Sequence, residues 1–390
     1  MNPILFDDHL RSQFLPLTFT RPIADLRFGI LKISEKWEKA FNSEISYQTE
    51  NYLTSKFPKT ISSENVYINA RYCPNSALIS AIQNLKKDEV LMHGETIVAY
   101  ILDKNSTLDI SKLNTIPIHF ELLYVEHITD LFSKNHRAIE ADFEILTAGR
   151  TSESIPETVT CFNKERIFVE KGAKLYNGTL NATDGPIYIG KDAEVMENAA
   201  IRGPFALCDH ATVKMGAKIY TGTTIGPHSK VGGEVSNSLI QGFSNKGHDG
   251  FLGNSVIGEW CNLGADTNTS NLKNNYASVK LWDYESSRFK DTGLQFCGLI
   301  MGDHSKCSIN MMFNTGTIVG VSANIFGSGF PRNFVPSFSW GGSQGVITYK
   351  LNKVFEVADI VMKRRSLNLT EEDRTILEHI FEATSSYRRD

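Results

Sequence analysis

The sequence of 390 residues lacks the features that would place it at once in several common classes. Its six cysteines are scattered without a Cys-x-x-Cys pair, and no two histidines lie two to five residues apart, which argues against a clustered zinc site. No apolar run approaches the roughly 20 residues of a membrane span, and no basic segment followed by an apolar stretch lies at the amino terminus. We therefore expect a reduced, cytoplasmic protein without a membrane partner.

The charge balance argues against a general affinity for polyanions. The formal net charge is −4, with 22% charged and 41% hydrophobic residues. Without an excess of Lys and Arg, nucleic acid is not attracted to the whole molecule, and any anionic ligand must be held by local cations. The composition is typical of a globular chain long enough for two domains, with small molecules and no nucleic acid as expected partners.

Aliphatic residues recur at every sixth position over one central stretch of the chain. The positions are Ile189, Val195, Ile201, Leu207, Val213, Ile219, Ile225 and Val231. A helix has a period of 3.6 and a flat strand a period of two, so neither produces this pattern. It is typical of hexapeptide repeats, in which each unit forms one side of a three-sided coil of about 18 residues. The repeat predicts a left-handed parallel β-helix.

The six-residue register is interrupted twice, and interruptions of a solenoid often carry its function. After Val231 the aliphatic positions resume at Ile257 and Leu263, so we expect a segment to loop out between them. The second interruption, residues 271–296, is rich in Asn, Lys, Tyr and Asp, and the register then returns at Met301.

The repeats divide the chain into three predicted parts. Residues 1–163 alternate short apolar runs, such as 66–68 and 98–100, with helix-like segments such as 30–41, which predicts an α/β domain. Residues 164–346 form the β-helix. Residues 347–390 have the apolar spacing of helices, and Thr370 with Asp373 forms a predicted capping pair.

The densest group of reactive side chains lies across the first interruption. His248 follows Glu234 by 14 residues and precedes Asn262 by 14, so with about 18 residues per coil these groups can share a cleft. A histidine oriented by a carboxylate is a standard general base, because its pKa near 6.5 suits proton removal at neutral pH. A histidine without such neighbours is more often a packed or surface residue. This is our interpretation of His210, His228 and His304.

These residues resemble the acetyltransferase half of the bacterial bifunctional N-acetylglucosamine-1-phosphate uridyltransferase/glucosamine-1-phosphate N-acetyltransferase, the GlmU family. The family carries a Glu, a His followed by an aromatic residue, an Asn-hydrophobic-Gly-Ala-x-Thr block and a further Asn at the same spacings. Here they are Glu234, His248, Phe251, residues 262–267 and Asn271. Nearly the full chain resembles the alternative form described for Bacteroidetes-type bacteria, whose shortened first domain begins with Phe-Asp-Asp and Pro-Leu-Thr-x-Thr-Arg-Pro.

The resemblance implies acetyl transfer from acetyl-CoA to glucosamine 1-phosphate. His248 would take the proton of the amine, and Glu234 would orient the imidazole or the amine. Phe251 replaces the family's sugar-contacting Tyr, Tyr220 replaces a phosphate-binding Arg, and Ser236 replaces a Lys. The implied substrate-binding residues are Asn262, Asn271, Phe251, Tyr220, Lys246, Lys273 and Lys280.

The family also implies an assembly and a position for the acetyl donor. Acyltransferase β-helices of this type form homotrimers with active sites between subunits, and acetyl-CoA lies along one edge of the coils. Ser308 and Asn310 fall near the CoA-contacting position.

The beginning of the chain is partly similar to nucleotide-sugar pyrophosphorylases, which place a strand, a phosphate-cradling loop with an Arg, and Pro-Leu-Thr in this order. Their loop is rich in glycine so that backbone amides approach the triphosphate, whereas this chain has Asp-Asp-His-Leu at residues 7–10. Cationic side chains could instead stabilise the negative charge of the triphosphate. The candidate nucleotide-binding residues are Arg11, Thr18, Arg21, Arg27 and Lys32.

Two interpretations of this domain stay open. Asp7 or Asp8 could hold Mg²⁺ for uridylyl transfer, or these acids could simply cap a turn. The domain is accordingly either an active uridyltransferase or a degenerate or regulatory unit.

Three hypotheses follow for the whole chain. The first is a bifunctional enzyme that acetylates glucosamine 1-phosphate and couples the product to UTP, giving UDP-N-acetylglucosamine for cell-envelope synthesis. The second is an acetyltransferase for another amino sugar or nucleotide sugar, with a degenerate or regulatory amino-terminal domain. The third is a non-catalytic trimeric scaffold with a sensor domain.

Overall fold

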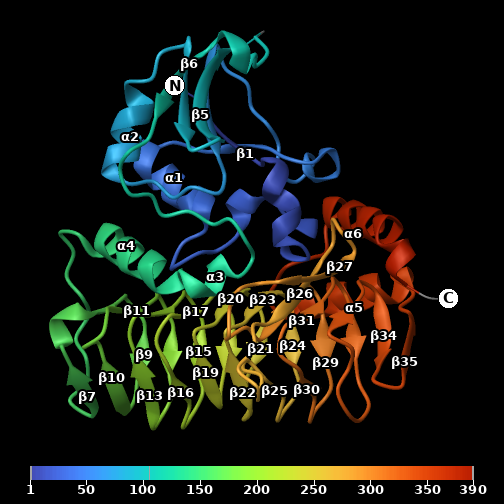
Figure 1. Ribbon diagram of the computed structural model, residues 1–390. Coiled ribbons are helices and arrows are strands. Elements are labelled where there is room, and N and C mark those ends of the chain that lie inside the picture. Colours follow the sequence, from blue (N-terminus) through green and yellow to red (C-terminus); the bar gives the residue numbers. More distant parts are fainter. Residues whose placement is uncertain (1, 105, 389–390) are drawn as a thin grey trace.

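The computed structural model describes residues 2–104 and 106–388. An α/β domain lies along one side of a long β-helix, and two carboxy-terminal helices pack at the far end of that β-helix (Figure 1). Among the described residues, no helix combines the length and the apolarity that crossing a bilayer requires. All six cysteines are free thiols.

The amino-terminal domain is built on a six-stranded mixed sheet with the strand order β2-β1-β3-β5-β4-β6. β1 pairs in parallel with β2 and β3, whereas β5 runs antiparallel to both β3 and β4. The strands are β1 (Asn2–Phe6), β2 (Ser46–Gln48), β3 (Glu64–Asn69), β4 (Glu89–His93), β5 (Thr96–Asp103) and β6 (Asn114–Pro117). The helices are α1 (Ile33–Phe41), α2 (Ser76–Gln83), α3 (Asp130–Ser133) and α4 (Asn135–Thr147). The predicted α/β fold of this domain is confirmed.

Most of the remaining chain forms three sheets that wrap around one apolar core, the predicted left-handed β-helix, and their strands are parallel except for the final pair of β34 and β35. The first sheet contains β7 (Val159–Phe162), β10 (Gly178–Asn181), β13 (Ala199–Arg202), β16 (Lys218–Ile219), β19 (Glu234–Ser236) and β22 (Phe251–Gly253), and the pair β25 (Asn268–Thr269) and β30 (Met312–Phe313) continues it. The second contains β8 (Ile167–Val169), β11 (Ile187–Ile189), β14 (Phe205–Leu207), β17 (Thr223–Ile225), β20 (Leu239–Gly242), β23 (Val256–Glu259), β28 (Leu299–Met301), β31 (Thr317–Val319) and β33 (Phe334–Val335).

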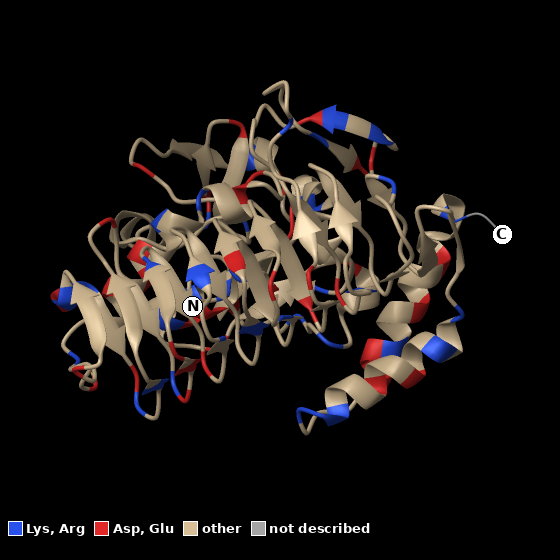
Figure 2. Ribbon diagram, turned by 90° about the horizontal axis from the view of Figure 1, so that it is seen from below, with Lys and Arg blue, Asp and Glu red and all other residues tan. Residues whose placement is uncertain are grey.

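The third sheet completes each coil. It contains β9 (Lys174–Leu175), β12 (Glu194–Val195), β15 (Thr212–Val213), β18 (Lys230–Val231), β21 (Asn245–Lys246), β24 (Asn262–Leu263), β29 (Lys306–Cys307), β32 (Asn324–Ile325), β34 (Ser339–Gly342) and β35 (Gly345–Thr348). The coil corners carry charges of both signs, while the strands between them are mostly uncharged (Figure 2). β7 already pairs with β10, so the first coil starts shortly before the expected boundary at residue 163.

The first interruption of the hexads is not a loop, contrary to the expectation from sequence. Ile189, Leu207 and Ile225 pair in succession, which gives coils of 18 residues. Ile225 then pairs with Ile240 and Ile240 with Ile257, so these two coils contain 15 and 17 residues. The solenoid continues without an excursion, because shortened corners shift the register. The missing aliphatic position is occupied by Lys246, which pairs with Val231.

The second interruption is a true excursion. Ile257 pairs with Met301, and the intervening chain leaves the coil to form the antiparallel hairpin of β26 (Lys280–Asp283) and β27 (Arg288–Asp291). Leu281 and Tyr284 of this hairpin are 7% exposed and belong to the same apolar cluster as the core of the amino-terminal domain. The hairpin therefore connects the two domains.

The second sheet is buried on both faces. Its inward residues line the β-helix core, while outward residues such as Leu239, Val256 and Ile300 pack into the amino-terminal domain. Further along the sheet, α4 covers Phe168 and Tyr188 through Ile139 and Phe143. Strands buried on both faces are apolar at successive positions, which explains the continuous aliphatic runs in this sheet.

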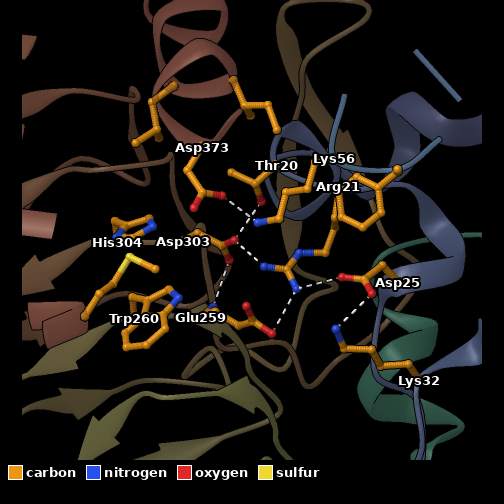
Figure 3. Close-up of a pocket in the computed structure, with 14 residues that line it drawn as sticks. Thr20, Arg21, Asp25, Lys32, Lys56, Glu259, Trp260, Asp303, His304 and Asp373 are labelled. Atoms are coloured by element: carbon orange, nitrogen blue, oxygen red, sulfur yellow. Dashed lines mark hydrogen bonds and ion pairs between the residues drawn. The ribbon is translucent and has the colours of Figure 1, made fainter. Parts of the chain in front are cut away.

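Buried ion pairs fix the amino-terminal domain to this sheet (Figure 3). The Arg21 guanidinium contacts the Glu259 carboxylate at 3.0 Å and also pairs with Asp303. The Nε of Arg27 donates to the Gln241 carbonyl at 3.1 Å, and Lys32 pairs with Asp25 at 2.8 Å. Arg21, Arg27 and Lys32, the candidate nucleotide-binding residues, thus each engage acceptors within the protein.

The chain ends in α5 (Leu351–Lys363) and α6 (Glu371–Ala383). Thr370 and Asp373 form the predicted capping box at the start of α6. Both helices bury apolar residues against the corner between the second and third sheets, where Trp260 and Phe338 lie in the same cluster.

The Arg21 cluster gives a stability prediction. Burial alone would raise the pKa of Glu259, but Arg21 and Lys32 outweigh it and hold that pKa well below the usual value of 4.5. Arg21→Met leaves two buried carboxylates without their cation, and we expect it to lower the free energy of unfolding by about 3–5 kcal/mol. Urea unfolding measures this loss, with Arg364→Met at an exposed position as the control.

The same cluster predicts a pH dependence. Glu259 stays ionised in the folded chain while its unfolded form takes up a proton below about pH 4.5, so its contribution to stability is present above that pH and is lost as the pH falls further. In Glu259→Gln this contribution is absent. Parallel pH curves for the wild-type protein and Glu259→Gln would contradict the assignment.

Candidate active site

The turn that carries His248 lies against two glycines of the preceding coil. A Cβ atom on Gly232 would lie 2.8 Å from the Gly247 carbonyl oxygen, and one on Gly233, whose φ is +71°, would lie 2.6 Å from that of Gly250. Only glycine permits this approach. Glu234 follows directly, and its amide donates to the Gly250 carbonyl at 3.1 Å. The two candidate catalytic residues therefore occupy neighbouring coils at the same corner.

Lys246 holds this turn from inside the β-helix. Its side chain is 2% exposed, and its ammonium group donates to the carbonyls of His248, Asp249 and Gly232 at 2.7, 3.2 and 3.2 Å. Burial lowers the pKa of Lys246 from 10.5 to about 8. All three donors of the ammonium group are used within the protein. Lys246 therefore has no donor left for the substrate phosphate that the resemblance implies.

Glu234 and Phe251 lie side by side on the first sheet. They are directly paired across β19 and β22, and both are half-buried, whereas His248 is exposed. No hydrogen bond or ion pair engages the side chains of Glu234 or His248 within residues 2–104 and 106–388. Both groups are thus available to a substrate.

Asn271 and Tyr220 border the same surface. A Cβ atom on Gly253 would meet the Phe251 ring at 2.5 Å and the Asn271 amide at 2.6 Å, so this glycine lets both side chains lie over the strand. The Asn271 amide donates to Asn254 at 2.8 Å. Tyr220 is 43% exposed and follows Ile219, the partner of Val235.

Three further predicted residues lie around the corner. Asn262 is exposed on the third sheet, between Asn245 and Lys306. Ser308 and Asn310 form a later turn at the corner that also carries His248, and the intervening Ile309 is 64% exposed. This edge is open along several coils, as an extended acyl donor requires.

The other histidines of the repeats lie at a different corner, between the second and third sheets. His228 stacks on His210 and on Phe243, with ring centroids 4.7 and 5.0 Å apart, and His304 stacks on Trp260 at 6.3 Å. Burial lowers the pKa of His304 to about 3. These histidines stack on aromatic neighbours, and His210 remains exposed, as expected for packed or surface residues.

Lys273 and Lys280 line a groove that sequence reasoning did not identify. It lies beside the hairpin of β26 and β27, and the other lining residues are Trp282, Phe289, Thr315, Arg332, Asn333 and Phe334. The only sequence signal was the concentration of aromatic and basic residues in the second interruption. Arg332 gave none, because it lies far along the chain.

The candidate nucleotide-binding residues of the amino-terminal domain lie after β1. Arg11 contacts Asp7 at 3.3 Å, donates to the Tyr52 hydroxyl at 2.9 Å and also donates to the Thr18 carbonyl. Thr18 is fully buried, and its hydroxyl donates to the Arg11 carbonyl at 3.2 Å. These residues therefore stabilise one another, and the Nη2 group of Arg11 is engaged within the protein.

Asp7 and Asp8 do not fit a prepared Mg²⁺ site. Asp8 accepts from Arg71 at 2.7 and 2.9 Å and from Asn69 at 2.9 Å, bonds that outweigh its burial and lower its pKa. Asp7 accepts from Thr49 and the Ile23 amide, and burial raises its pKa to about 6. The described residues contain no cluster of three or more His, Cys, Asp or Glu side chains that could hold a metal ion.

The fold combines an α/β domain with a hexapeptide-repeat solenoid, and a known family matches the first of these parts. Residues 3–151 match the family described as sugar nucleotidyl transferase. This match covers the amino-terminal domain.

Several curated relatives carry names of bifunctional proteins. The chain is 37% identical to the bifunctional protein GlmU of Methanocaldococcus jannaschii over 87 residues, which are 22% of this chain and 21% of that protein. It is 29% identical to a bifunctional sugar-1-phosphate nucleotidylyltransferase/acetyltransferase of Sulfurisphaera tokodaii over 165 residues, 37% of this chain and 41% of that protein. The matches thus span between about a fifth and two fifths of these two relatives.

Among solved structures, an Arabidopsis UDP-N-acetylglucosamine acyltransferase is similar over 60% of this chain and 99% of its own, at 15% identity. The TM-score is 0.24, too low to support any conclusion about function.

The buried Lys246 predicts an unusual pH dependence of stability. Its amine loses a proton near pH 8 in the folded chain but near 10.5 when unfolded, so the unfolded state binds more protons between these values. The free energy of unfolding should therefore rise across this window by about 3 kcal/mol relative to Lys246→Met. Urea unfolding at pH 7.5, 9 and 10.5 tests this. An unchanged difference between the two proteins would show that the ammonium carries no burial penalty.

Proposed function

We propose that the β-helix transfers the acetyl group of acetyl-CoA to the amine of glucosamine 1-phosphate, with His248 as the general base. The observation that carries this proposal is the packing of the His248 turn on Gly232 and Gly233, which brings His248 and Glu234 to adjacent coils at one corner, both with side chains that no hydrogen bond within the described residues engages. Such a pair can take a proton and orient the group that gives it.

The chemistry is nucleophilic acyl substitution. The uncharged amine attacks the thioester carbonyl, the new C–N bond forms, and His248 accepts the proton that the nitrogen loses. The C–S bond then breaks, and the CoA sulfur leaves and recovers a proton, giving free thiol and the N-acetyl sugar. Glu234 orients the imidazole or the amine, and Phe251 and Asn271 border the acceptor.

For the amino-terminal domain we propose uridylyl transfer from UTP to N-acetylglucosamine 1-phosphate, releasing pyrophosphate and UDP-N-acetylglucosamine. The family match of residues 3–151 supports this assignment. Asp7 and Asp8 do not fit the divalent cation expected for such a reaction, so no catalytic step is assigned to a metal here. A domain that binds nucleotide without turnover is the competing proposal.

We also propose a homotrimer in the cytoplasm. The supporting observation is that the amino-terminal domain covers the second sheet while Glu234 and Phe251 lie on the first, which leaves the candidate site accessible to a neighbouring copy. Acetyl-CoA and UTP are metabolites of that compartment.

The decisive variant is His248→Ala. It removes the general base without touching the core, so we expect kcat for thiol release from acetyl-CoA to fall by about 10²–10⁴-fold with an unchanged melting temperature. Thiol and pyrophosphate are followed separately with glucosamine 1-phosphate, acetyl-CoA, UTP and Mg²⁺ present.

His210→Ala is the matched control, because His210 is also an exposed histidine at a coil corner. It should leave both rates unchanged. Wild-type thiol release that persists in His248→Ala would refute the mechanism. Thiol release without pyrophosphate would assign the amino-terminal domain to a binding role.

A further inference from the structure

The groove beside the hairpin is lined by basic, aromatic and small polar side chains. It encloses about 720 Å³ between the strands of the hairpin and residues 332–334. Three of its lining residues, Lys273, Lys280 and Arg332, are cations, and none is an acid. By contrast, the pocket around Arg21 contains acids and bases together and is closed by their ion pairs.

The cations of this groove have spare donors. Lys280 and Arg332 are exposed and make no hydrogen bond or ion pair within the part of the chain that the structure describes. Lys273 uses one donor, to the Ser278 carbonyl at 2.6 Å. Nearby, Asp291 accepts from the Ser278 hydroxyl at 2.7 Å and from the Gly293 amide at 2.8 Å. Asp291 also faces Lys280 across the hairpin and interacts electrostatically with both lysines, so it offsets part of their charge, whereas the lining of the groove itself contains three cations and no acid.

Its apolar wall is aromatic and rigid. Trp282 stacks on Phe334 with centroids 4.3 Å apart and an interplanar angle of 9°, and Phe289 meets Trp282 edge to face at 5.4 Å. Phe289 remains 41% exposed, so part of its ring is free. Behind this wall, Tyr284 is buried and its carbonyl accepts from the Tyr387 hydroxyl at 3.1 Å.

The groove adjoins the proposed acetyl-transfer surface. Lys273 follows Asn271 by two residues, and the Asn271 amide lies with the Phe251 ring over Gly253. A ligand that reached from the amine near Glu234 past Asn271 would place its distal end among these cations.

We propose that this groove binds the nucleoside diphosphate part of a substrate. Cations on flexible side chains suit phosphate oxygens, Arg332 can bind two of them at once, and an exposed aromatic ring suits a planar base. Two substrates carry this moiety: the acyl donor, as the adenosine diphosphate of CoA, or a nucleotide-linked amino sugar as acceptor. Only the link between the groove and acetyl transfer rests on the proposed function. Binding of a nucleoside diphosphate in the groove does not depend on it.

Photoaffinity labelling of the full-length protein tests the proposal. 8-azido-ADP and 5-azido-UDP are each photolysed with the protein, and labelled peptides are mapped by mass spectrometry. We expect label within residues 280–291 or 329–336 from at least one probe. Competition by CoA identifies the donor, and competition by UDP-glucosamine identifies a nucleotide-linked acceptor.

Charge variants decide whether the groove is responsible. Lys280→Gln combined with Arg332→Gln should raise the probe concentration for half-maximal labelling of these peptides by about tenfold or more. Arg288→Gln, an exposed position on the same hairpin outside the groove, should not. Absence of label from these peptides with both probes, or equal labelling in the double variant, would overturn the proposal.

Labelling also separates this inference from the proposed function. It requires no turnover, and it is read at peptides distinct from those of the amino-terminal domain. Groove labelling in a protein that releases no thiol would refute acetyl transfer alone, whereas thiol release without groove labelling would refute the groove alone.

Discussion

The contact of Arg21 with Glu259 and Asp303 fixes the position of the amino-terminal domain on the β-helix. Charges buried this deeply are costly unless each has its partner, so the domain can dock only where the guanidinium meets both carboxylates. The apolar residues of the second sheet add buried area to this interface, but apolar burial is not directional and does not select one orientation of the domain. With the domain docked in this orientation, one side of the hairpin of β26 and β27 packs against it, and the other side lines the groove.

A second buried charge shapes the candidate site. Lys246 occupies a position that an aliphatic residue fills in the regular coils. Burying its charge costs free energy, and its pKa is lowered for the same reason. Its ammonium group compensates by binding three carbonyls that converge on the His248 turn. An aliphatic side chain could fill the same space but could not bind these carbonyls. The local departure from the ideal repeat is thus what positions the imidazole.

Much of the fold could be predicted from sequence because the hexads repeat a local rule. In the regular coils the inward hexad residues from Ile189 to Val231 are aliphatic and specify the solenoid, and the Thr370–Asp373 capping box is equally local. Lys246 was misassigned because a lysine in a polar segment gives no sign that it points inward. The role of Arg21 could not be predicted, because its partners lie more than 200 residues away in the sequence and a single charged residue does not indicate which distant residue it will pair with. The positions of Glu234 and His248 on adjacent coils followed from the repeat length, while the groove required folding to bring Arg332 to the hairpin.

The burial of the second sheet has a consequence for how this molecule can meet others. A three-sided solenoid ordinarily has three surfaces to offer, but here one is occupied by the chain's own first domain, and α5 and α6 close the adjoining corner. The first and third sheets remain accessible, together with the corner between them that carries the His248 turn. Substrates and neighbouring subunits can therefore approach the candidate site only from these two sides, because the first domain occupies the other.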